Sequence, residues 1–431
     1  MLAIPETIAP LLKRPVGVFG KGVTGKAVVD LLKVMGAAYV VYDEKCLECS
    51  VFDSIAAKQH NLVIYSPGFS QEHPWLKLAR ENGCTCLAEM DFAAVFWQGE
   101  IIAVTGTNGK TTLTEFMAQA LCQLGKKAIA VGNNGSPLSG FWRNFEDKAA
   151  VAVCETSSFQ SEDLKYLQPD AVLWTNFDED HMDRHQTMEK YFNAKWNLIE
   201  RLQNGIAIIG ESVYQWAKKM NKTMPANLYI AEDQSHMPTG TIFEKYPQSE
   251  NFAIARKYWV EKDYALAILL EAASAFKLPK HRLQKVAKIG EVSFWNDSKA
   301  TNFHATQAAL RGFEKPIIWI GGGAGKGLDT KKLIDAIYDK IAMAFLIGDE
   351  AEKLQKNIEE KGGISVICKT LEEVVKCAYA YSEKYKGSET DIVFSPGFTS
   401  YDMFDNYAHR GNCYEEIVLR LKHESKANIP K

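Results

Sequence analysis

A short glycine-rich segment carries the residue types that bind phosphate groups. Residues 106–112 read GTNGKTT and directly follow the apolar run Ile101 to Val104. The run predicts a buried strand, and the apolar spacing after the segment predicts a helix. In such a loop, backbone N–H groups converge on phosphate oxygens, Lys110 supplies a cation, and the hydroxyl of Thr111 is placed to hold Mg²⁺. The segment therefore predicts a phosphate-binding loop between a strand and a helix.

The longer phosphate-loop consensus, GxxxxGK[ST], is incomplete in this chain. It requires glycine at position 104, where the sequence has Val104. A tight turn with an exposed lysine is the alternative interpretation. The strand and the helix on either side favour the phosphate-binding loop.

Polar clusters follow three further predicted strands. Strand 128–131 ends in GNNG, strand 151–154 in ETSSFQ, and strand 171–174 in TNFDEDHMDRH. In an open α/β sheet, ligands bind at the carboxyl ends of the strands. Glu155 is well placed as a second magnesium ligand, and the last cluster offers more candidate ligands. A solvated acidic loop is the alternative for that cluster, whose charged residues are Asp178, Asp180, His181 and Asp183.

A lysine lies where an apolar residue is expected. The stripe from Met188 to Leu202 predicts an amphipathic helix, and Lys195 falls on its apolar face. A lysine in this position must extend its ammonium to water, pair with another group, or be chemically altered, because burying a bare ammonium is costly. Spacing alone leaves these outcomes open.

The N-terminal segment predicts a second nucleotide site. Strand 16–19 is followed by GKGVTG, a helix, and strand 39–42, which ends at Asp43. This order is typical of a Rossmann-type opening, and the same turn suits a dinucleotide or any nucleotide pyrophosphate. A third strand, 62–65, runs into the small-residue turn SPGF at 66–69. Both loops fall on the ligand-binding edge of a parallel sheet.

The rest of the chain predicts further alternating strands and helices. Strands at 206–209 and 228–231 are followed by polar connections up to about residue 260, and then by a helix at 264–276. A third strand–helix series begins at Val292 and continues with the segment IIWIGGGAGKGLD at 317–329 and strands at 344–347 and 365–367. It ends with the segment at 391–412. Its polar clusters also follow strands.

Composition limits the classes of protein that fit. A length of 431 residues suggests about three domains, and 46% hydrophobic with 24% charged residues is typical of globular proteins. A net charge of −3 does not favour a nucleic-acid partner. No stretch approaches the roughly 18 apolar residues of a membrane span, and prolines interrupt the first fifteen residues. We therefore expect a cytoplasmic protein with no membrane insertion.

The nine cysteines include two close pairs. Cys46 and Cys49 form a CxxC, and Cys84 and Cys86 form a CxC beside a predicted strand. These pairs could form a zinc site or a redox pair. The scatter of the remaining cysteines favours reduced structural thiols.

Taken together, the motifs resemble those of the Mur ligases. GTNGKTT is shared with a wider group that includes folylpolyglutamate synthetases. More discriminating are ETSSFQ at 155–160, DHMDRH at 180–185, NDSKATN at 296–302 and SPGFTSYDMFDNYAHRGN at 395–412. The resemblance runs from Val16 to about Glu416 and is strongest to the members that add D-glutamate.

The resemblance implies an α/β protein of three domains. These would be a Rossmann-like domain for the uridine nucleotide at 1–97, a central phosphate-loop ATPase with a mainly parallel sheet at 98–278, and a Rossmann-like amino-acid domain at 279–431. The implied reaction joins D-glutamate to UDP-N-acetylmuramoyl-L-alanine with ATP, through an acyl phosphate, in peptidoglycan precursor synthesis. Two Mg²⁺ ions, a carbamylated Lys195 and a monomeric protein are implied as well.

The resemblance also assigns residues. Lys110, His181 and Lys195 would act in catalysis, and Thr111, Glu155, His181 and the Lys195 carbamate would bind metal. ATP would contact Gly106, Thr107, Asn108, Gly109, Lys110, Thr111, Thr112, Asn251, Arg282 and Asp297. The UDP-substrate would contact Val23, Thr24, Asp43, Glu44, Lys45, Gly68, Asn133, Ser157 and Gln160. D-Glutamate would contact Lys299, Thr301, Lys326, Ser400, Tyr401 and Tyr407.

The chain departs from the family pattern at several of these positions. Glu250 stands beside Asn251 where a histidine is usual, and Leu283 follows the His-Arg pair. Tyr401 and Tyr407 replace a leucine and a phenylalanine, so the acceptor pocket would be more polar. A ligase for another acceptor, a nucleotide-dependent regulatory protein and an NAD-dependent oxidoreductase are the competing functions. The nucleotide-type N-terminus opposes a folate ligase, and the phosphate loop opposes the oxidoreductase.

Overall fold

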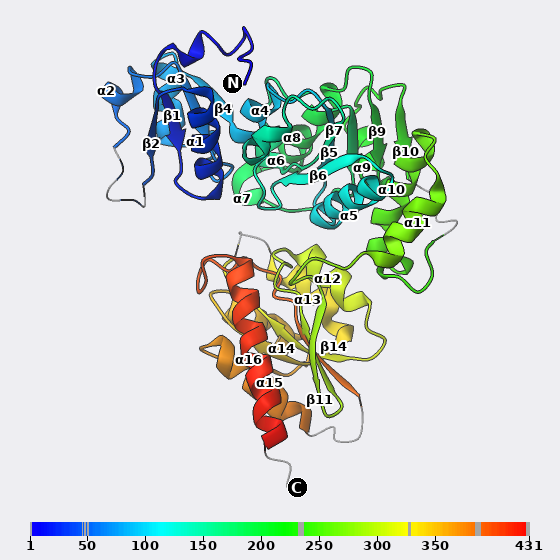
Figure 1. Cartoon of the computed structure of the whole chain (residues 1–431). Coiled ribbons are helices and arrows are strands. Elements are labelled where there is room, and N and C mark those ends of the chain that lie inside the picture. Colours follow the sequence, from blue (N-terminus) through cyan, green and yellow to red (C-terminus); the bar gives the residue numbers. More distant parts are fainter. Residues whose placement is uncertain are drawn as a thin grey trace. The chain divides into compact units, whose positions relative to one another are not determined.

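The computed structural model describes residues 2–44, 46, 49, 51–231, 237–325, 329–383 and 389–427 (Figure 1). Their strands form three sheets, of four, six and six strands. The chain divides into two compact units. The first unit comprises Met1–Phe177, Arg184–Glu244 and Gln248–Phe276, and the second comprises Asp178–Asp183, Lys245–Pro247 and Lys277–Lys431.

The first sheet of unit 1 is parallel and has the order β2-β1-β3-β4. Its elements are β1 (Val16–Phe19), α1 (Val23–Met35), β2 (Tyr39–Tyr42), α2 (Ser54–Ala57), β3 (Leu62–Tyr65), α3 (Pro74–Glu81), β4 (Thr85–Ala88) and α4 (Glu89–Ala94), preceded by a 3₁₀ helix at Leu11–Lys13. Strands β1 and β3 are buried apolar runs, whereas β2 is mostly half-buried. The aromatic rings of Phe19 and Phe52 lie 4.7 Å apart in the buried core of this sheet. The strands predicted at 16–19, 39–42 and 62–65 are confirmed.

The second sheet of unit 1 is also parallel, in the order β10-β9-β8-β5-β7-β6. Its strands are β5 (Glu100–Thr105), β6 (Lys127–Gly132), β7 (Ala150–Glu155), β8 (Ala171–Trp174), β9 (Ile206–Ile209) and β10 (Leu228–Ile230). The accompanying helices are α5 (Lys110–Gln123), α6 (Ser158–Ser161), α7 (Met182–His185), α8 (Met188–Glu200), α9 (Glu211–Lys219), α10 (Gln248–Glu261) and α11 (Leu266–Ala275), with 3₁₀ turns at Leu138–Asn144 and Ile242–Glu244. Because β5 is central, the loop that follows it lies in the middle of the ligand-binding edge.

The expectation of polar connections up to residue 260 is wrong for α10. This helix buries Phe252, Ile254, Ala255, Tyr258 and Trp259 in the same apolar core as α5 and α11. Burial of residues on several sides of the helix weakens the apolar–polar contrast that identifies a helix in a sequence. Tertiary packing therefore specifies α10 more strongly than its own periodicity.

Two buried carboxylates on α4 join the first sheet to the second within unit 1. Asp91 is fully buried and accepts backbone hydrogen bonds from Lys165, Tyr166 and Leu167 at 2.8–2.9 Å. Glu89 accepts one from the backbone of Ser139 at 2.7 Å. These bonds satisfy amide groups that would otherwise be buried without partners, so α4 is a fixed connection between the two sheets.

Unit 2 contains the third sheet, in the order β11-β12-β16-β13-β14-β15. Its strands are β11 (Gln284–Ile289), β12 (Val292–Asn296), β13 (Ile317–Gly321), β14 (Ile341–Leu346), β15 (Ser365–Ile367) and β16 (Thr390–Phe394). Its helices are α12 (Phe303–Arg311), α13 (Thr330–Ile337), α14 (Ala351–Glu360), α15 (Leu371–Ser382) and α16 (Tyr407–Ala427), with a 3₁₀ turn at Tyr338–Lys340. All neighbours are parallel except β11 with β12, and β11 was not anticipated from the sequence.

The expected mixed α/β class with parallel sheets is confirmed. The division into three domains at residues 97 and 278 stays a prediction. Among the described residues, no helix is long and apolar enough to cross a membrane.

Candidate functional site

The predicted phosphate loop lies between β5 and α5 and depends on two glycines. Gly106 and Gly109 have φ angles of +147° and +84°, which other residues rarely adopt. A Cβ atom on Gly106 would lie 1.9 Å from Oγ1 of Thr175, and one on Gly109 would lie 2.5 Å from Oδ1 of Asn251. The loop therefore passes close to β8 and α10, and it directs the N-terminal amides of α5 toward one place.

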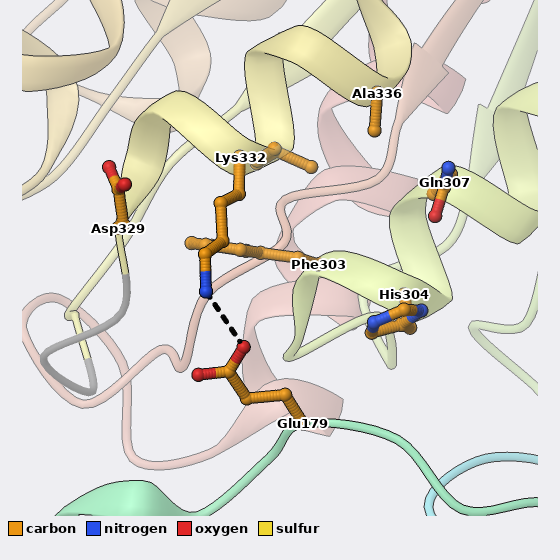
Figure 2. Close-up of a pocket in the computed structure, with 8 residues that line it drawn as sticks. Glu179, Phe303, His304, Gln307, Asp329, Lys332 and Ala336 are labelled. Atoms are coloured by element: carbon orange, nitrogen blue, oxygen red, sulfur yellow. Dashed lines mark hydrogen bonds and ion pairs between the residues drawn. The ribbon is translucent and has the colours of Figure 1, made fainter.

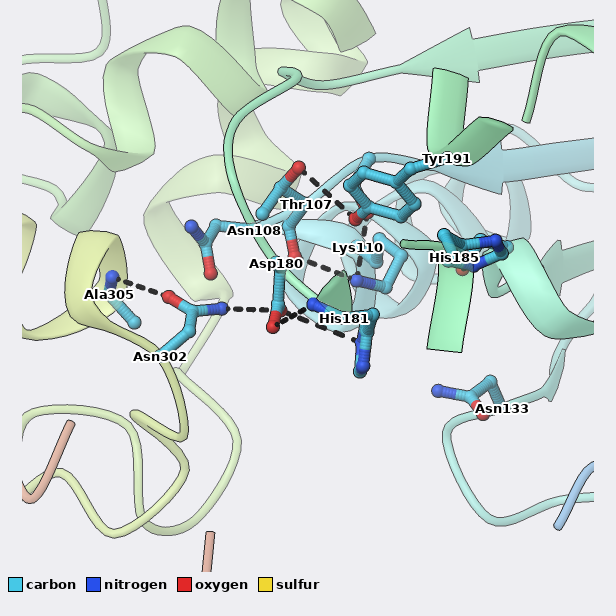
Figure 3. Close-up of polar contacts among 12 residues, drawn as sticks. Thr107, Asn108, Lys110, Asn133, Asp180, His181, His185, Tyr191, Asn302 and Ala305 are labelled. Carbon is cyan, nitrogen blue, oxygen red and sulfur yellow. Dashed lines mark hydrogen bonds and ion pairs between the residues drawn. The ribbon is translucent and has the colours of Figure 1, made fainter. Parts of the chain in front are cut away.

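Lys110, the first residue of α5, lies over this loop. Its Nζ atom donates hydrogen bonds to the carbonyl oxygens of Gly106 and Thr107, both at 2.9 Å (Figure 3). The hydroxyl of Thr107 lies 3.3 Å from that of Tyr191, and Thr111 is buried in the first turn of the helix. A cation at the helix N-terminus matches the predicted role of Lys110 toward phosphate oxygens.

Residues that sequence reasoning missed hold the loop in place. The backbone N–H of Asn108 donates to Oδ1 of Asn176 at 2.8 Å, and the hydroxyl of Thr175 donates to the carbonyl of Asn108. Both residues directly follow β8, in the polar cluster that begins TNF. Their position directly after a predicted strand indicated that they lie at the ligand-binding edge of the sheet. It did not indicate that they contact Asn108.

Lys195 does not extend to water, so the snorkelling alternative is wrong. Its side chain is 1% exposed, and its Nζ donates to the carbonyl of Gly106 at 2.8 Å and to Oγ1 of Thr105 at 3.3 Å. The same nitrogen lies 5.0 Å from the ring centroid of Tyr191. The buried lysine thus reaches the phosphate loop from α8.

Glu155 ends β7 beside the phosphate loop, where it pairs in register with Val104 of β5. Its Oε1 accepts a hydrogen bond from Nδ2 of Asn133 at 3.1 Å. Its Oε2 is buried and has no hydrogen-bond partner among the described residues. A buried carboxylate oxygen without a donor fits a cation ligand, because an unpaired buried charge is otherwise costly. Asn133, predicted to contact the muramoyl substrate, is thus held by the same carboxylate.

Ser157 and Gln160 bond to each other. The Ser157 hydroxyl accepts from the Gln160 backbone at 3.3 Å, and Gln160 Oε1 accepts from the Ser157 backbone at 3.0 Å. This is a capping box at the start of α6. The next residue, Ser158, lies 2.9 Å from Nε2 of His185. The structure therefore places both predicted substrate contacts at the second sheet's ligand-binding edge, in a local cap.

The N-terminal nucleotide loop has the geometry expected of a Rossmann-type turn. Gly20 has a φ of +98°, and a Cβ atom on Gly25 would lie 1.8 Å from the carbonyl oxygen of Gly20. Helix α1 begins at Val23 after Gly22, and the side chain of Val23 is 67% exposed. Thr24 follows in the first turn. The backbone N–H groups at the start of this helix can donate hydrogen bonds to a phosphate group.

The acidic residues after β2 lie beside this turn. Asp43 Oδ2 accepts from the backbone of Lys21 at 2.7 Å, and Glu44 Oε1 lies 3.4 Å from Nε2 of His73. Space is open around Gly68 in the loop after β3. These residues thus come together at the edge of the first sheet, whereas Lys45 lies outside the described residues.

In unit 2, the segment Asp178–Asp183 contacts helices α12 and α13. Asp180 is 3% exposed and accepts a 2.9 Å hydrogen bond from Nδ2 of Asn302, whose Oδ1 caps α12 (Figure 3). Asp178 pairs with His304 at 2.6 Å. His181 has a φ of +56°, and its Nε2 lies 3.5 Å from Asp180 Oδ2. A solvated acidic loop is therefore the wrong interpretation for Asp180.

A small hollow of unit 2 lies beside this segment. Its volume is about 190 Å³, and it has Phe303, Leu333 and Ala336 as apolar lining (Figure 2). At its rim, Lys332 forms a 3.1 Å ion pair with Glu179. None of the predicted site residues that the structure describes lines this hollow.

Apart from Lys326, the residues predicted for D-glutamate follow two neighbouring parallel strands, β12 and β16. Lys299 and Thr301 follow β12, and the Lys299 ammonium lies 5.3 Å from the ring centroid of Tyr407. Ser400 is buried after β16, whereas Tyr401 is 75% exposed. The structure brings these two loops together, but Lys326 lies outside the described residues.

Arg410 connects the two loops that are predicted to bind D-glutamate, and sequence reasoning missed it. It is 3% exposed and donates to Oγ of Ser298 at 3.0 Å and to the carbonyls of Phe398 and Thr399 at 3.1 and 3.2 Å. Burial lowers its pKa to about 10. The arginine of the motif HRGN was visible in the sequence, but nothing there identified its carbonyl partners.

Asp297 and Arg282, predicted to contact the nucleotide, differ in their surroundings. Asp297 accepts from the hydroxyl of Ser395 at 2.7 Å and from the backbone of Leu283 at 3.0 Å. Burial raises the pKa of Asp297 to about 6, although the Ser395 hydrogen bond and the Arg282 charge oppose this shift. Nε of Arg282 is buried without a hydrogen-bond partner among the described residues. Asn251 lies against Gly109 and donates to Gln248 at 2.8 Å.

The cysteines are unpaired by disulfides, in agreement with the expectation of reduced thiols. Within the part of the chain that the structure describes, no group of three His, Cys, Asp or Glu side chains could hold a metal ion. This result leaves open a Mg²⁺ site at Glu155, because Mg²⁺ commonly takes one carboxylate together with phosphate oxygens and water.

Comparison with known proteins agrees with this geometry. The model of the Mur ligase middle domain matches residues 104–271, and that of the Mur ligase glutamate ligase domain matches residues 281–394. A UDP-N-acetylmuramoylalanine--D-glutamate ligase of Koribacter versatilis is 30% identical over 95% of this chain and 98% of its own. A ligase of the same name from Desulfatibacillum aliphaticivorans is 32% identical over 84% of this chain and 85% of its own.

Solved structures show the same fold. The UDP-N-acetylmuramate-alanine ligase MurC from Thermotoga maritima matches 95% of this chain and all of its own, with a TM-score of 0.59 at 15% identity. The MurF ligase from the same organism, in complex with ADP, matches 87% of this chain and 97% of its own, with a TM-score of 0.55 at 16% identity. With the sequence matches above, these results show that the chain belongs to the Mur ligase family.

Proposed function

We propose that this protein is an ATP-dependent ligase that adds D-glutamate to UDP-N-acetylmuramoyl-L-alanine in peptidoglycan precursor synthesis. The observation that carries the proposal is the pairing of Glu155 and Lys195 with one phosphate loop. A buried carboxylate oxygen without a donor and a buried lysine border the loop from two different elements. The names of the relatives that match over most of their length identify the two substrates that the ligase would join.

The chain's own residues support a two-step reaction. The muramoyl-alanine carboxylate attacks the γ-phosphate of ATP, giving an acyl phosphate and ADP. The amine of D-glutamate then attacks the acyl carbon, and phosphate leaves as the amide bond forms. Lys110 and the amides of 106–112 would hold the phosphates and stabilise charge on the transferring group, which is the main requirement of phosphoryl transfer. His181 would lie between metal and substrate.

Thr111 and Glu155 would hold Mg²⁺, which neutralises phosphate charge when bound. We also propose that Lys195 carries a carbamate, which would convert its buried cation into an anionic oxygen ligand and would support a second metal ion. Carbon-13 NMR after exposure to labelled bicarbonate tests this directly. A carbamate signal that is lost in Lys195→Arg supports the assignment, and its absence from the wild-type protein overturns it.

The remaining loops would bind the other ligands. Val23, Thr24, Asp43, Glu44, Lys45 and Gly68 would hold the uridine nucleotide, and Asn133, Ser157 and Gln160 the muramoyl part. Lys299, Thr301, Lys326 and Ser400 would pair with the carboxylates of D-glutamate, with Tyr401 and Tyr407 as walls. Asn251, Arg282 and Asp297 would contact ATP. We propose three corresponding domains at 1–97, 98–278 and 279–431, in a cytoplasmic monomer.

The decisive experiment measures phosphate release from ATP with a panel of nucleotide and amino-acid substrates. Release that requires both UDP-N-acetylmuramoyl-L-alanine and D-glutamate supports the proposal, and mass spectrometry of the product should show the added residue. Dependence on another amino acid or on a folate would assign a different acceptor. Release that needs no acceptor would indicate an ATPase without ligase chemistry.

A further inference from the structure

The loop that carries Asn133 is held at both of its ends. At its start, the N–H of Gly132, the last residue of β6, donates to the carbonyl of Ser136 at 2.7 Å. At its end, the N–H of Ser139 donates to Oε1 of Glu89 at 2.7 Å. Residues 132–139 therefore form a closed loop, and a carboxyl group from α4 fastens its far end.

Glu89 supplies an acceptor that the 3₁₀ helix Leu138–Asn144 needs. The residue before this helix is Pro137, which makes no side-chain capping bond. The first amides of a helix have no carbonyl partner within it, so their acceptor must come from elsewhere. For the amide of Ser139 that acceptor is Glu89, and both residues are buried. Because both groups are buried, removal of the carboxyl group would leave this amide without a partner.

The next residue of α4 contacts the loops that end β6 and β7. A Cβ atom on Gly132 would lie 2.7 Å from Cε of Met90. Sδ of Met90 accepts a 3.7 Å hydrogen bond from the hydroxyl of Thr156, and both of these residues are buried. The first two residues of α4 therefore contact the two loops that carry Asn133 and Ser157.

The 3₁₀ helix Leu138–Asn144 also packs against α1, whose start is predicted to bind the uridine nucleotide. A Cβ atom on Gly140 would lie 3.8 Å from Cβ of Ala27, which is an ordinary packing distance. Glu89 itself directly follows β4, at the carboxyl end of that strand in the first sheet. Its bond to Ser139 therefore joins the ligand-binding edge of the first sheet to a loop of the second.

The bond requires an acceptor oxygen and not a negative charge. Burial raises the pKa of Glu89, and the backbone hydrogen bond from Ser139 opposes this rise. Burial thus favours the uncharged carboxyl group, whose carbonyl oxygen can still accept a hydrogen bond. Glutamine has the same length and keeps such an oxygen, whereas methionine fills a similar volume without one. These two substitutions separate the acceptor from the bulk of the side chain.

From these contacts we infer that Glu89 is a positioning residue for the muramoyl part of the UDP-substrate. It acts through residues 132–139, which place the side chain of Asn133 beside Glu155. The inference rests on the proposed function, because Asn133 and Ser157 are substrate contacts only in such a ligase. The uridine turn after β1 does not depend on this bond. Loss of the acceptor should therefore weaken binding of the whole UDP-substrate and leave binding of UDP unchanged.

Calorimetry with these two ligands tests the positioning role. Glu89→Met should bind UDP-N-acetylmuramoyl-L-alanine about tenfold or more weakly than wild type and should bind UDP equally well. Its KM for ATP should stay the same, and Glu89→Gln should restore the lost affinity. Glu89→Asp, which withdraws the acceptor by one methylene, should show an intermediate loss and replaces Glu89→Met if that variant does not fold. Wild-type affinity for the UDP-substrate in these variants, or an equal loss of UDP binding, overturns the inference.

Asp91→Asn is the matched control for damage to α4. Asp91 lies two residues further along this helix and is also buried, but it accepts hydrogen bonds from the backbone amides of residues 165–167. The control should lower the stability of the protein without a selective loss of affinity for the UDP-substrate. A selective loss as large as that of Glu89→Met would mean that any damage to α4 weakens the site, and would overturn a specific role of Glu89.

Hydrogen exchange without ligand tests the bond independently of the proposed function. Peptides covering residues 132–145 should exchange faster in Glu89→Met or Glu89→Asp than in wild type or Glu89→Gln, whereas peptides covering 162–170 should not change. Unaltered exchange at 132–145 overturns the inference. If exchange responds as expected but wild type does not bind UDP-N-acetylmuramoyl-L-alanine, the proposed substrate is wrong, and the role of Glu89 in fixing the loop is still supported.

Discussion

Nδ2 of Asn133 donates a 3.1 Å hydrogen bond to Oε1 of Glu155, while Oε2 of the same buried carboxylate has no protein donor among the described residues. One oxygen is therefore committed to positioning a substrate loop, and the other remains available to a cation. We expect Glu155→Gln to raise the Mg²⁺ concentration for half-maximal activity by about tenfold or more. Without nucleotide or metal the variant should be at least as stable as wild type, because it removes a buried charge.

A magnesium titration of the ligase rate and a thermal unfolding scan measure these two effects. Glu100→Gln is the matched control, because Glu100 begins β5, the strand that pairs with β7, at the end away from the phosphate loop, and forms an ion pair with Lys262 at 3.0 Å. The control should leave the Mg²⁺ requirement unchanged. An unaltered requirement in Glu155→Gln would exclude Glu155 as a metal ligand.

Lys110→Ala should lower kcat by roughly a hundredfold or more, because it removes a cation that stabilises charge on the transferring phosphoryl group. The fold should survive, since the hydrogen bonds from Nζ to the carbonyls of Gly106 and Thr107 join Lys110 to its own loop (Figure 3). Circular dichroism and initial rates check this. Lys127→Ala, at the start of β6, should keep wild-type activity. Normal turnover in Lys110→Ala would show that catalysis occurs elsewhere.

Lys299→Met should raise the KM for D-glutamate much more than the KM for ATP. A charge-assisted hydrogen bond to a carboxylate contributes about 1.5–3 kcal/mol, which corresponds to roughly tenfold or more in affinity. Steady-state kinetics with each substrate varied in turn measures the two constants. Lys288→Met, which removes an exposed lysine of the same unit that pairs with Glu291, should change neither. If both constants rise together, Lys299 belongs to the phosphate site.

Asp91→Ala should destabilise the protein by about 2–5 kcal/mol. The substitution leaves the buried N–H groups of Lys165, Tyr166 and Leu167 without an acceptor. Asp163→Ala is the control, because this partly exposed residue makes only a 3.5 Å contact with Arg80 and should cost less than about 1 kcal/mol. Urea denaturation of both variants provides the comparison. Equal effects would mean that the buried amides find other partners.

Asp297 should make unit 2 less stable as pH rises from about 4 to about 6. Its pKa is raised from 3.8 to about 6, so in this window the folded state binds more protons than the unfolded state. The cost of ionisation is absent below pH 4 and fully present above pH 6, and it is at most about 3 kcal/mol. Hydrogen exchange of peptides from β12 and β16, compared between wild type and Asp297→Asn at each pH, measures how much the ionisation of Asp297 lowers the stability of unit 2. Parallel profiles in the two proteins would contradict the assignment.

Much of the sheet architecture could be predicted because parallel strands are continuous apolar runs. The bounds of β1, β2, β3, β8 and β9 agree with the runs that identify them in the sequence. The loops that follow these runs held most candidate residues for the same reason. Elements without a clear apolar pattern were missed. Helix α10 is buried on several sides, and β11, at the edge of its sheet, has Lys285 and Lys288 among its apolar residues.

Side-chain partners could not be predicted, because they depend on residues far apart in the sequence. The sequence placed Lys195 on an apolar stripe, but only the fold showed that the carbonyl of Gly106 accepts its hydrogen bond. Likewise, Arg410 was visible in a motif, whereas its bonds to Ser298 and Phe398 depend on the pairing of β12 with β16. The spacing of residue types in the sequence predicts which chemistry a segment can carry out. Tertiary packing decides which groups its side chains contact.

The close approach of α10 to the phosphate loop has an evolutionary consequence. A Cβ atom on Gly109 would lie 2.5 Å from the side chain of Asn251, which itself bonds to Gln248. Positions 109 and 251 therefore share one small volume, and a larger residue at either position requires a change at the other. We expect related ligases to vary these two positions together. Helix α10, whose sequence has only a weak helical pattern, would then limit which residues the phosphate loop can contain.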